Sequence, residues 1–144
     1  MKVFLAGIIQ GSLATADIHE QDWRTPIRRV IEAQYPDAEI YCHYSQHPNS
    51  ITYDLPQIRT TFVQGLSRCI DADLTIAYLP SASMGTAIEI YEAYRHGKIV
   101  LTVTPMDANW VVRLYSHRIF PTIEALEAFL ASDEATKLLS PCGC

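Results

Sequence analysis

A chain of 144 residues has the length of one ordinary domain, and its 49% hydrophobic and 19% charged residues are typical of a globular protein with a core. This composition excludes a disordered or fibrous chain. Eleven Lys and Arg residues against sixteen Asp and Glu residues give a formal net charge of −5, which would repel a nucleic-acid backbone. The phosphate loop of nucleotide triphosphatases and the dinucleotide fingerprint Gly-x-Gly-x-x-Gly are absent from the sequence, which argues against both enzyme classes.

The amino-terminal residues 1–9 are apolar but lack the features of a secretory signal, and no run approaches the roughly 18 apolar residues of a membrane span. We therefore expect a cytoplasmic protein. Cys42 and Cys69 stand alone, while Cys142 and Cys144 are neighbours near the carboxyl terminus, so the cysteines match no zinc motif. We expect two buried thiols and two thiols in the tail. The histidines also lack metal-ligand spacing, so neither a metal nor another cofactor is expected.

Short apolar runs alternate along the chain with segments of helical periodicity, and Gly, Pro, Asn and Ser separate them. A polar stretch at 45–56 indicates a long loop, and loops of this kind are often functional. Residues 131–144 are expected to be a frayed tail. In chain order, we predict a strand at 2–9, a helix at 22–34, a strand at 38–44, a helix at 55–69, a strand at 74–79, a helix at 86–96, a strand at 99–103, a helix at 110–116, a strand at 118–120 and a helix at 122–130.

This alternation predicts a single α/β domain over 1–144, with a doubly wound, flavodoxin-like, five-stranded parallel sheet covered by helices on both faces. In such a sheet the ligand lies beyond the carboxyl ends of the strands, where the strand order switches between the first and third strands. The loops that reach this edge are 8–22, 45–56, 80–86 and 104–109. The fold by itself does not specify the chemistry.

The densest chemical signal is the strand-to-helix turn within 78–89, which is rich in small and hydroxyl residues. Ser83, Gly85 and Thr86 lie where a helix begins, so hydroxyls and free backbone N–H groups there suit a sugar hydroxyl or a phosphate oxygen. Glu89 lies about one turn further and can point back at the ligand. The residues alone leave a second interpretation open, because Ser and Thr also cap ordinary helices and an early Glu complements the helix dipole. Glu92, three residues on, is expected to be solvated.

The segments 2–7, 72–74 and 84–98 resemble the nucleoside 2-deoxyribosyltransferase family, and the resemblance extends from residue 2 to about 130. Its most specific part is the step from Gly85 to Glu89, followed by Ala93 and by Gly97-Lys98 before a strand. The resemblance implies a transferase that moves a 2-deoxyribosyl group between nucleobases by double displacement. Glu89 falls on the nucleophile position and would form a covalent glycosyl intermediate. We expect its carboxylate to be ionised, favoured by the nearby helix N-terminus.

Two positions depart from the family pattern. The family holds the hydroxyl end of the sugar with an acidic residue where this chain has Ser83, and related nucleoside monophosphate N-glycosidases carry a serine there that contacts a 5′-phosphate. Two alternatives therefore stay open: a hydrolase of deoxynucleoside 5′-monophosphates, and a nucleotide-binding module without turnover. The family's acid for the leaving base corresponds to Gln64, which can hydrogen-bond a base but cannot protonate it. Asp54 is a possible substitute acid, or else the N-cap of the following helix.

Further substrate contacts are expected from the strand ends and loops. The resemblance places the base at the end of the first strand, near Phe4 and Gly7, although Phe4 could equally belong to the core. Gln10 in the first loop and Gln46 in the polar loop are also expected to bind substrate. The substrates implied are a deoxynucleoside and a free nucleobase.

The resemblance also implies a homo-oligomer with shared active sites, because in the family a neighbouring subunit contributes an Asn that contacts the sugar. Asn109, or His117 before the last strand, is the local candidate for this contact. His117 could instead be an ordinary surface histidine. An exposed Trp110 would suit a contact between subunits.

Overall fold

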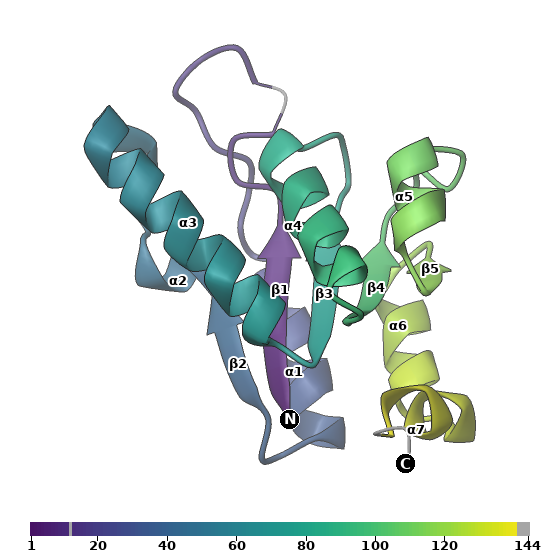
Figure 1. The fold of residues 1–144 in the computed structure, drawn as a ribbon. Coiled ribbons are helices and arrows are strands. Elements are labelled where there is room, and N and C mark those ends of the chain that lie inside the picture. Colours follow the sequence, from purple (N-terminus) through teal and green to yellow (C-terminus); the bar gives the residue numbers. More distant parts are fainter. Residues whose placement is uncertain (12, 141–144) are drawn as a thin grey trace.

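The computed structural model describes residues 1–11 and 13–140 and shows a parallel sheet with helices on both faces (Figure 1). The sheet has five strands in the order β2-β1-β3-β4-β5, and every neighbouring pair is parallel. The order switches between β1 and β3, which confirms the flavodoxin-like prediction. The strands are β1 (Lys2–Gly7), β2 (Glu39–Cys42), β3 (Leu74–Tyr78), β4 (Ile99–Val103) and β5 (Arg118–Phe120).

The helices form two layers. On one face lie α1 (Arg24–Gln34) and α6 (Ile123–Leu130), with α7 (Asp133–Leu139) packed against α6. On the other face, α3 (Leu55–Asp71), α4 (Met84–Arg95) and α5 (Trp110–Tyr115) lie side by side (Figure 1). Among the described residues, no helix is both long enough and apolar enough to cross a membrane.

Two apolar clusters, one on each face of the sheet, form the core. Val3 and Leu5 of β1 pack toward α1 and α6, whereas Phe4 and Ala6 pack toward α3 and α4. This is the period-two alternation of a strand that is buried on both faces. Cys42 belongs to the first cluster and Cys69 to the second, and both thiols are free and buried, as predicted.

The second strand is shorter than the predicted 38–44. It pairs only with β1, in a register that ends at Leu5 opposite Cys42, although β1 itself continues to Gly7, because the chain turns into a helix at His43. The helical turn α2 (His43–Gln46) follows at once, and the short 3-10 helix η1 (Ser50–Thr52) follows it. The predicted polar loop therefore contains two helical turns that hold its side chains in place.

The tail was expected to fray from residue 131, and this expectation is wrong for Asp133–Leu139, which form α7. Ser132 caps this helix by accepting a hydrogen bond from the backbone N–H of Ala135, and Ala135 is fully buried. Arg118 of β5 also forms an ion pair with Glu134, with a distance of 2.6 Å between Nη2 and Oε1. The tail thiols Cys142 and Cys144 lie outside the described residues.

Candidate active site

A cavity of about 300 Å³ lies beyond the carboxyl ends of β1 and β3, where the strand order switches. We call it the front cavity. The expected residues that line it are Gly7, Gln10, Ser83, Gly85, Thr86 and Glu89. Ile9, Gly11 and Met84 also line it and belong to the predicted edge loops 8–22 and 80–86, whereas sequence reasoning did not place His43, Phe62 and Gly65 there. The structure thus brings the predicted turn before α4 together with parts of β1, α2 and α3.

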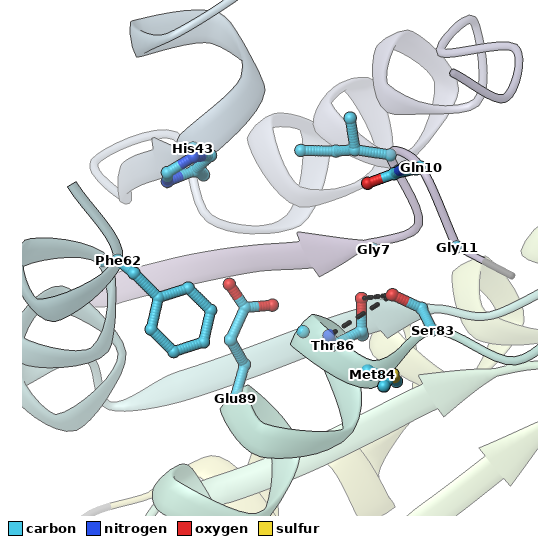
Figure 2. Close-up of a pocket in the computed structure, with 12 residues that line it drawn as sticks. Gly7, Gln10, Gly11, His43, Phe62, Ser83, Met84, Thr86 and Glu89 are labelled. Atoms are coloured by element: carbon cyan, nitrogen blue, oxygen red, sulfur yellow. Dashed lines mark hydrogen bonds between the residues drawn. The ribbon is translucent and has the colours of Figure 1, made fainter. Parts of the chain in front are cut away.

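The floor of the front cavity is the N-terminus of α4, which begins at Met84, two residues before the predicted start. Ser83 is the N-cap, and its Oγ accepts a hydrogen bond of 3.4 Å from the backbone N–H of Thr86. The hydroxyls of Ser83 and Thr86 are 3.0 Å apart (Figure 2). The first-turn N–H groups of Met84 and Gly85 have no partner within the helix and can therefore donate to a ligand.

Glu89 is half-buried, and Figure 2 shows its carboxylate directed into the space between Phe62 of α3 and His43 of α2. None of the described residues donates a hydrogen bond to this carboxylate. Burial raises the pKa of Glu89 to about 8, and the positive charge of Arg24 acts in the opposite direction. At neutral pH the free protein therefore holds a proton on Glu89.

The expectation that Glu89 is ionised is therefore wrong for the free protein. Counting from the Ser83 cap, Glu89 is the sixth residue of α4 and lies beyond the first turn, where the helix dipole acts most strongly. Removal of water from the carboxylate dominates instead. A ligand that supplies positive charge or a hydrogen-bond donor would shift the group toward its ionised form.

Arg24 is the cation that acts on Glu89, but its guanidinium is engaged elsewhere. Its Nη1 donates to Cys42 Sγ at 3.1 Å and its Nε donates to Gln21 Oε1 at 2.9 Å. The guanidinium also lies 4.2 Å from the ring centroid of Trp23. Arg24 does not line the front cavity, and no described lining residue is Arg or Lys. The cavity therefore favours a neutral ligand over an anion.

His43 borders the front cavity on the side opposite α4 (Figure 2). Gly65 of α3 lies against it, since a Cβ at Gly65 would lie 3.4 Å from His43 Nδ1, which is van der Waals contact. Burial lowers the pKa of His43, and the neighbouring His47 and Arg24 lower it further. The imidazole is therefore neutral at pH 7 and can take up or release a proton across the front cavity from Glu89. A signal for His43 was present in the sequence, since it directly follows the strand that pairs with β1.

The front cavity continues between α3 and η1 into an adjoining hollow of about 280 Å³. Ile9, Gln10, His43 and Phe62 border both spaces. The hollow is further lined by Ser50, Ile51, Tyr53, Ile58 and Thr61. The site thus has a polar end over α4 and a more apolar end over α3, with His43 at the junction.

Two expected substrate contacts, Phe4 and Gln46, lie away from the front cavity. Phe4 is fully buried in the core and stacks on Tyr41 with ring centroids 5.5 Å apart, because its strand position faces α3 and not the strand end. Gln46 ends α2 and borders a different surface hollow, next to Lys2 and Arg68.

Neither Gln64, at the position of the family's acid, nor the possible substitute acid Asp54 lines the front cavity. Asp54 is the N-cap of α3 and forms a capping box with Gln57, in which each side chain bonds the other's backbone N–H. Gln64 lies on the exposed side of α3, because the helix turns Phe62 and Gly65 toward the cavity. The capping interpretation of Asp54 is therefore the correct one.

The two residues expected to reach a neighbouring subunit have structural roles within the chain. Asn109 caps α5 by accepting hydrogen bonds from the backbone N–H groups of Val111 and Val112. His117 Nδ1 accepts a hydrogen bond of 3.0 Å from the backbone N–H of Val100, which ties the start of β5 to β4. Neither side chain lines the front cavity.

Because the pKa of Glu89 is raised in the folded state, stability should depend on pH. The folded protein keeps a proton that the unfolded chain releases above about pH 4.5, so stability is expected to fall as pH rises from about 4.5 to about 8 and then level off. Glu89→Gln should remove this dependence. We expect the Tm of Glu89→Gln minus that of the wild type to grow through this window. A difference that stays constant from pH 4 to 9 would contradict the raised pKa.

Comparisons with known proteins show the fold. The chain is similar to a 2-deoxyribosyltransferase from Bacillus psychrosaccharolyticus, with 17% identity, a TM-score of 0.68 and coverage of 94% of this chain and 95% of the other. It is similar to a conserved protein from Enterococcus faecalis V583, with 17% identity, a TM-score of 0.60 and coverage of 90% and 96%. It is also similar to the CMP N-glycosidase BcmB from Clostridium botulinum, with 19% identity, a TM-score of 0.55 and coverage of 90% and 98%. No protein-family model and no curated protein matches the sequence.

Proposed function

We propose that the protein is an enzyme that acts on the N-glycosidic bond of 2′-deoxynucleosides and transfers the 2-deoxyribosyl group to a second nucleobase. The observation that carries this proposal is the Glu89 carboxylate, which points into the front cavity toward His43 and lies above hydroxyls and free N–H groups at the start of α4. A fold shared with a 2-deoxyribosyltransferase and with a CMP N-glycosidase supports it.

Glu89 is the nucleophile in this mechanism. One carboxylate oxygen bonds to C1′ of the sugar while the C1′–N bond breaks, and the electron pair of that bond leaves with the base. The result is a glycosyl ester on Glu89. A ring nitrogen of the second base then attacks C1′ and releases the carboxylate, so the two displacements retain the configuration at C1′.

His43 is the general acid and base in this proposal. It donates a proton to the departing base, and as a neutral imidazole it later takes a proton from the incoming base. The free site already holds the required proton, because burial places it on Glu89 and leaves His43 neutral. Moving this proton from Glu89 to His43 on substrate binding would produce the nucleophile and the acid together.

The polar end of the front cavity recognises the 5′ end of the sugar. The hydroxyls of Ser83 and Thr86 and the N–H groups of the first turn can bond a neutral 5′-hydroxyl, and no described lining residue supplies a positive charge for a phosphate. A hydrolase of deoxynucleoside 5′-monophosphates is the second candidate, since a helix N-terminus with a serine cap can also hold a phosphate. In that case water replaces the second base.

Incubation of the protein with a deoxynucleoside, with and without a free acceptor base, tests the proposal by chromatography of the products. We expect a new nucleoside only when the acceptor is present. Free sugar and base without any new nucleoside would support the hydrolase. If neither product forms from nucleosides or from their 5′-monophosphates, the remaining alternative is a binding module without turnover.

Ser83→Asp is expected to keep or improve the use of unphosphorylated deoxynucleosides and to abolish any activity on 5′-monophosphates. Aspartate is also a good N-cap, so α4 should still begin at Met84. The added carboxylate would repel a 5′-phosphate and accept a charge-assisted hydrogen bond from a 5′-hydroxyl. Each effect on substrate binding should be about 1–3 kcal/mol, as for one charged contact. The measurement is kcat/KM for both substrate forms.

Ser83→Thr is the matched control, because it keeps a neutral hydroxyl cap. A wild type that prefers the monophosphate and loses it on Ser83→Asp would favour the hydrolase. If neither substrate responds to Ser83→Asp, Ser83 only caps the helix.

We also propose that the active protein is a homo-oligomer. Apolar side chains of α4 and α5 are strongly exposed, with 79% of Met84, 80% of Trp110 and 60% of Leu114 accessible. Met84 belongs to this surface and to the wall of the front cavity, so a second copy that covers it would also close the cavity. We expect light scattering to give more than the monomer mass, and Trp110→Glu to lower both mass and activity. A fully active monomer at assay concentration would contradict shared sites.

A further inference from the structure

Arg24 of α1 is a buried cation without a carboxylate partner. It is 8% exposed, and the ion pairs found among residues 1–11 and 13–140 involve other basic side chains. Burying a charge is costly unless an opposite charge or strong hydrogen bonds compensate it. A buried charge of this kind that acts on the titratable groups of a cavity is therefore a candidate for function.

The side chains that hold the Arg24 guanidinium in place are not carboxylates. Nη1 donates to Cys42 Sγ at 3.1 Å, and Nε donates to Gln21 Oε1 at 2.9 Å. The guanidinium carbon lies 4.2 Å from the ring centroid of Trp23 and 5.2 Å from that of Tyr44, within reach of cation–π attraction. These contacts fix the position of the charge but leave it without an anion.

The same contacts support two walls of the front cavity from outside it. Cys42 and Tyr44 flank His43 at the corner where β2 turns into α2. Gln21, which accepts the hydrogen bond from the guanidinium, donates through its own Nε2 to the backbone O of Ile8 at 3.1 Å. Ile8 lies between two residues that line the front cavity. Loss of the guanidinium would therefore loosen both the His43 corner and the end of β1.

The charge of Arg24 also acts on both reacting groups of the site. Burial raises the pKa of Glu89, and Arg24 acts against this effect by favouring the carboxylate. Burial lowers the pKa of His43, and His47 and Arg24 lower it further. A fixed positive charge thus favours the ionised nucleophile and makes a protonated His43 a stronger acid.

Among the described residues, Arg24 is the one charged group that acts on the pKa of Glu89. Tyr41 of β2 and Cys69 of α3 are also close enough to respond to the charge of Glu89. Burial raises the pKa of both groups, so both stay protonated and uncharged at neutral pH. Neither can replace Arg24 as a counter-charge.

We propose that Arg24 is a positioning residue of the Glu89 site, which anchors the His43 corner and the end of β1 and supplies the positive charge that balances ionised Glu89. Arg24 acts through these groups and does not touch the substrate, because it does not line the front cavity. Its effect on turnover rests on the proposed function, whereas its coupling to the charge of Glu89 does not.

Thermal unfolding tests this coupling without any turnover. The Tm of Glu89→Gln minus that of its parent grows with pH until Glu89 is ionised in the folded protein. We call the pH at which this difference levels off the plateau pH, which should be about 8 in the wild type. In the Arg24→Met background it should be higher by about one pH unit, the lower end of what a nearby opposite charge contributes.

Two variants control for changes other than the loss of charge. Arg24→Lys keeps the positive charge and should restore the plateau pH of the wild type. Arg28→Met is the matched control, since Arg28 lies one turn further along α1 and pairs with Glu32 on the surface. This change should leave both the plateau pH and the turnover as they are, because surface ion pairs contribute little.

Steady-state kinetics test the anchoring. Arg24→Met should lower kcat by about 10–100-fold, the cost of slightly displaced reacting groups, and should change KM by less than about threefold. Cys42→Ala removes the acceptor of Nη1 but keeps the charge, so it should lower kcat several-fold at an unchanged plateau pH. Arg24→Gln, which keeps a polar head group without the charge, replaces Arg24→Met if that variant does not fold.

A plateau pH that is the same in Arg24→Met and in the wild type would overturn the proposal, because the charge of Arg24 would then not reach Glu89. Turnover in Arg24→Met as high as in Arg28→Met would overturn it as well. A raised plateau pH in a protein without transferase or hydrolase activity would refute the proposed function and leave the coupling of Arg24 to Glu89 standing. Transferase activity with an unshifted plateau pH would do the reverse.

Discussion

Glu89→Ala is expected to lower turnover by several orders of magnitude while the protein stays folded. The proposed covalent route requires a carboxylate at C1′, and the hydrogen bonds proposed between the substrate and Ser83 and Thr86 would not replace it. The fold should not suffer, because none of the described residues donates a hydrogen bond to the Glu89 carboxylate, and loss of its desolvation cost should favour the folded state. The measurement is kcat/KM for a deoxynucleoside, together with thermal unfolding of both proteins.

Glu92→Gln is the matched control, since Glu92 lies one turn further along α4 and pairs with Arg95 and His96. This change should leave turnover within about a factor of two, because surface ion pairs contribute little. Mass spectrometry of the wild type incubated with substrate alone should also detect the sugar on the peptide that carries Glu89. If Glu89→Ala keeps more than about a tenth of the activity, the covalent mechanism is wrong.

His43→Gln is expected to lower kcat on ordinary purine deoxynucleosides by about 10²–10⁴-fold, the usual contribution of a positioned general acid. Glutamine can still hydrogen-bond the base but cannot protonate it. The loss should nearly vanish with 7-methyl-2′-deoxyguanosine, because its base already carries a positive charge and leaves without a proton. The ratio of the two losses separates proton transfer from simple positioning.

His47→Gln is the control for this change, because the ring of His47 lies beside that of His43, with centroids 5.1 Å apart, but His47 does not line the front cavity. It should affect both substrates equally and only slightly. If His43→Gln reduces activity on both substrates by the same factor, His43 positions the substrate and another group supplies the proton.

The sequence predicts the sheet well because each inner strand carries its own signal. Leu74–Tyr78 and Ile99–Val103 are short apolar runs between turn residues, as expected for strands buried on both faces. The end of β2 and the presence of α7 were harder to predict from the sequence. β2 ends where the chain turns into α2 at His43, and α7 packs on the rest of the domain through an ion pair to β5 and through burial of Ala135.

The turn before α4 could also be found from local sequence, because caps and first turns are short-range features. Ser83, Gly85, Thr86 and Glu89 lie together in the front cavity since one helix start holds them all. His43, Phe62 and Gly65 join them from α2 and α3, across the switch in strand order. Which residues of a helix face a cavity depends on its packing angle, and for this reason Phe62 and Gly65 reach the cavity and Gln64 does not.

The sequence by itself determined the type of parallel sheet, the edge where the front cavity lies and the start of the helix that carries Glu89, because each follows from periodicity, turn residues or capping chemistry close along the chain. Only the tertiary structure decided the raised pKa of Glu89 and the position of His43 across the front cavity. A pKa depends on how much water the neighbours remove, and a cavity depends on which side chains meet from distant segments. Neither quantity is encoded in a local pattern of residues.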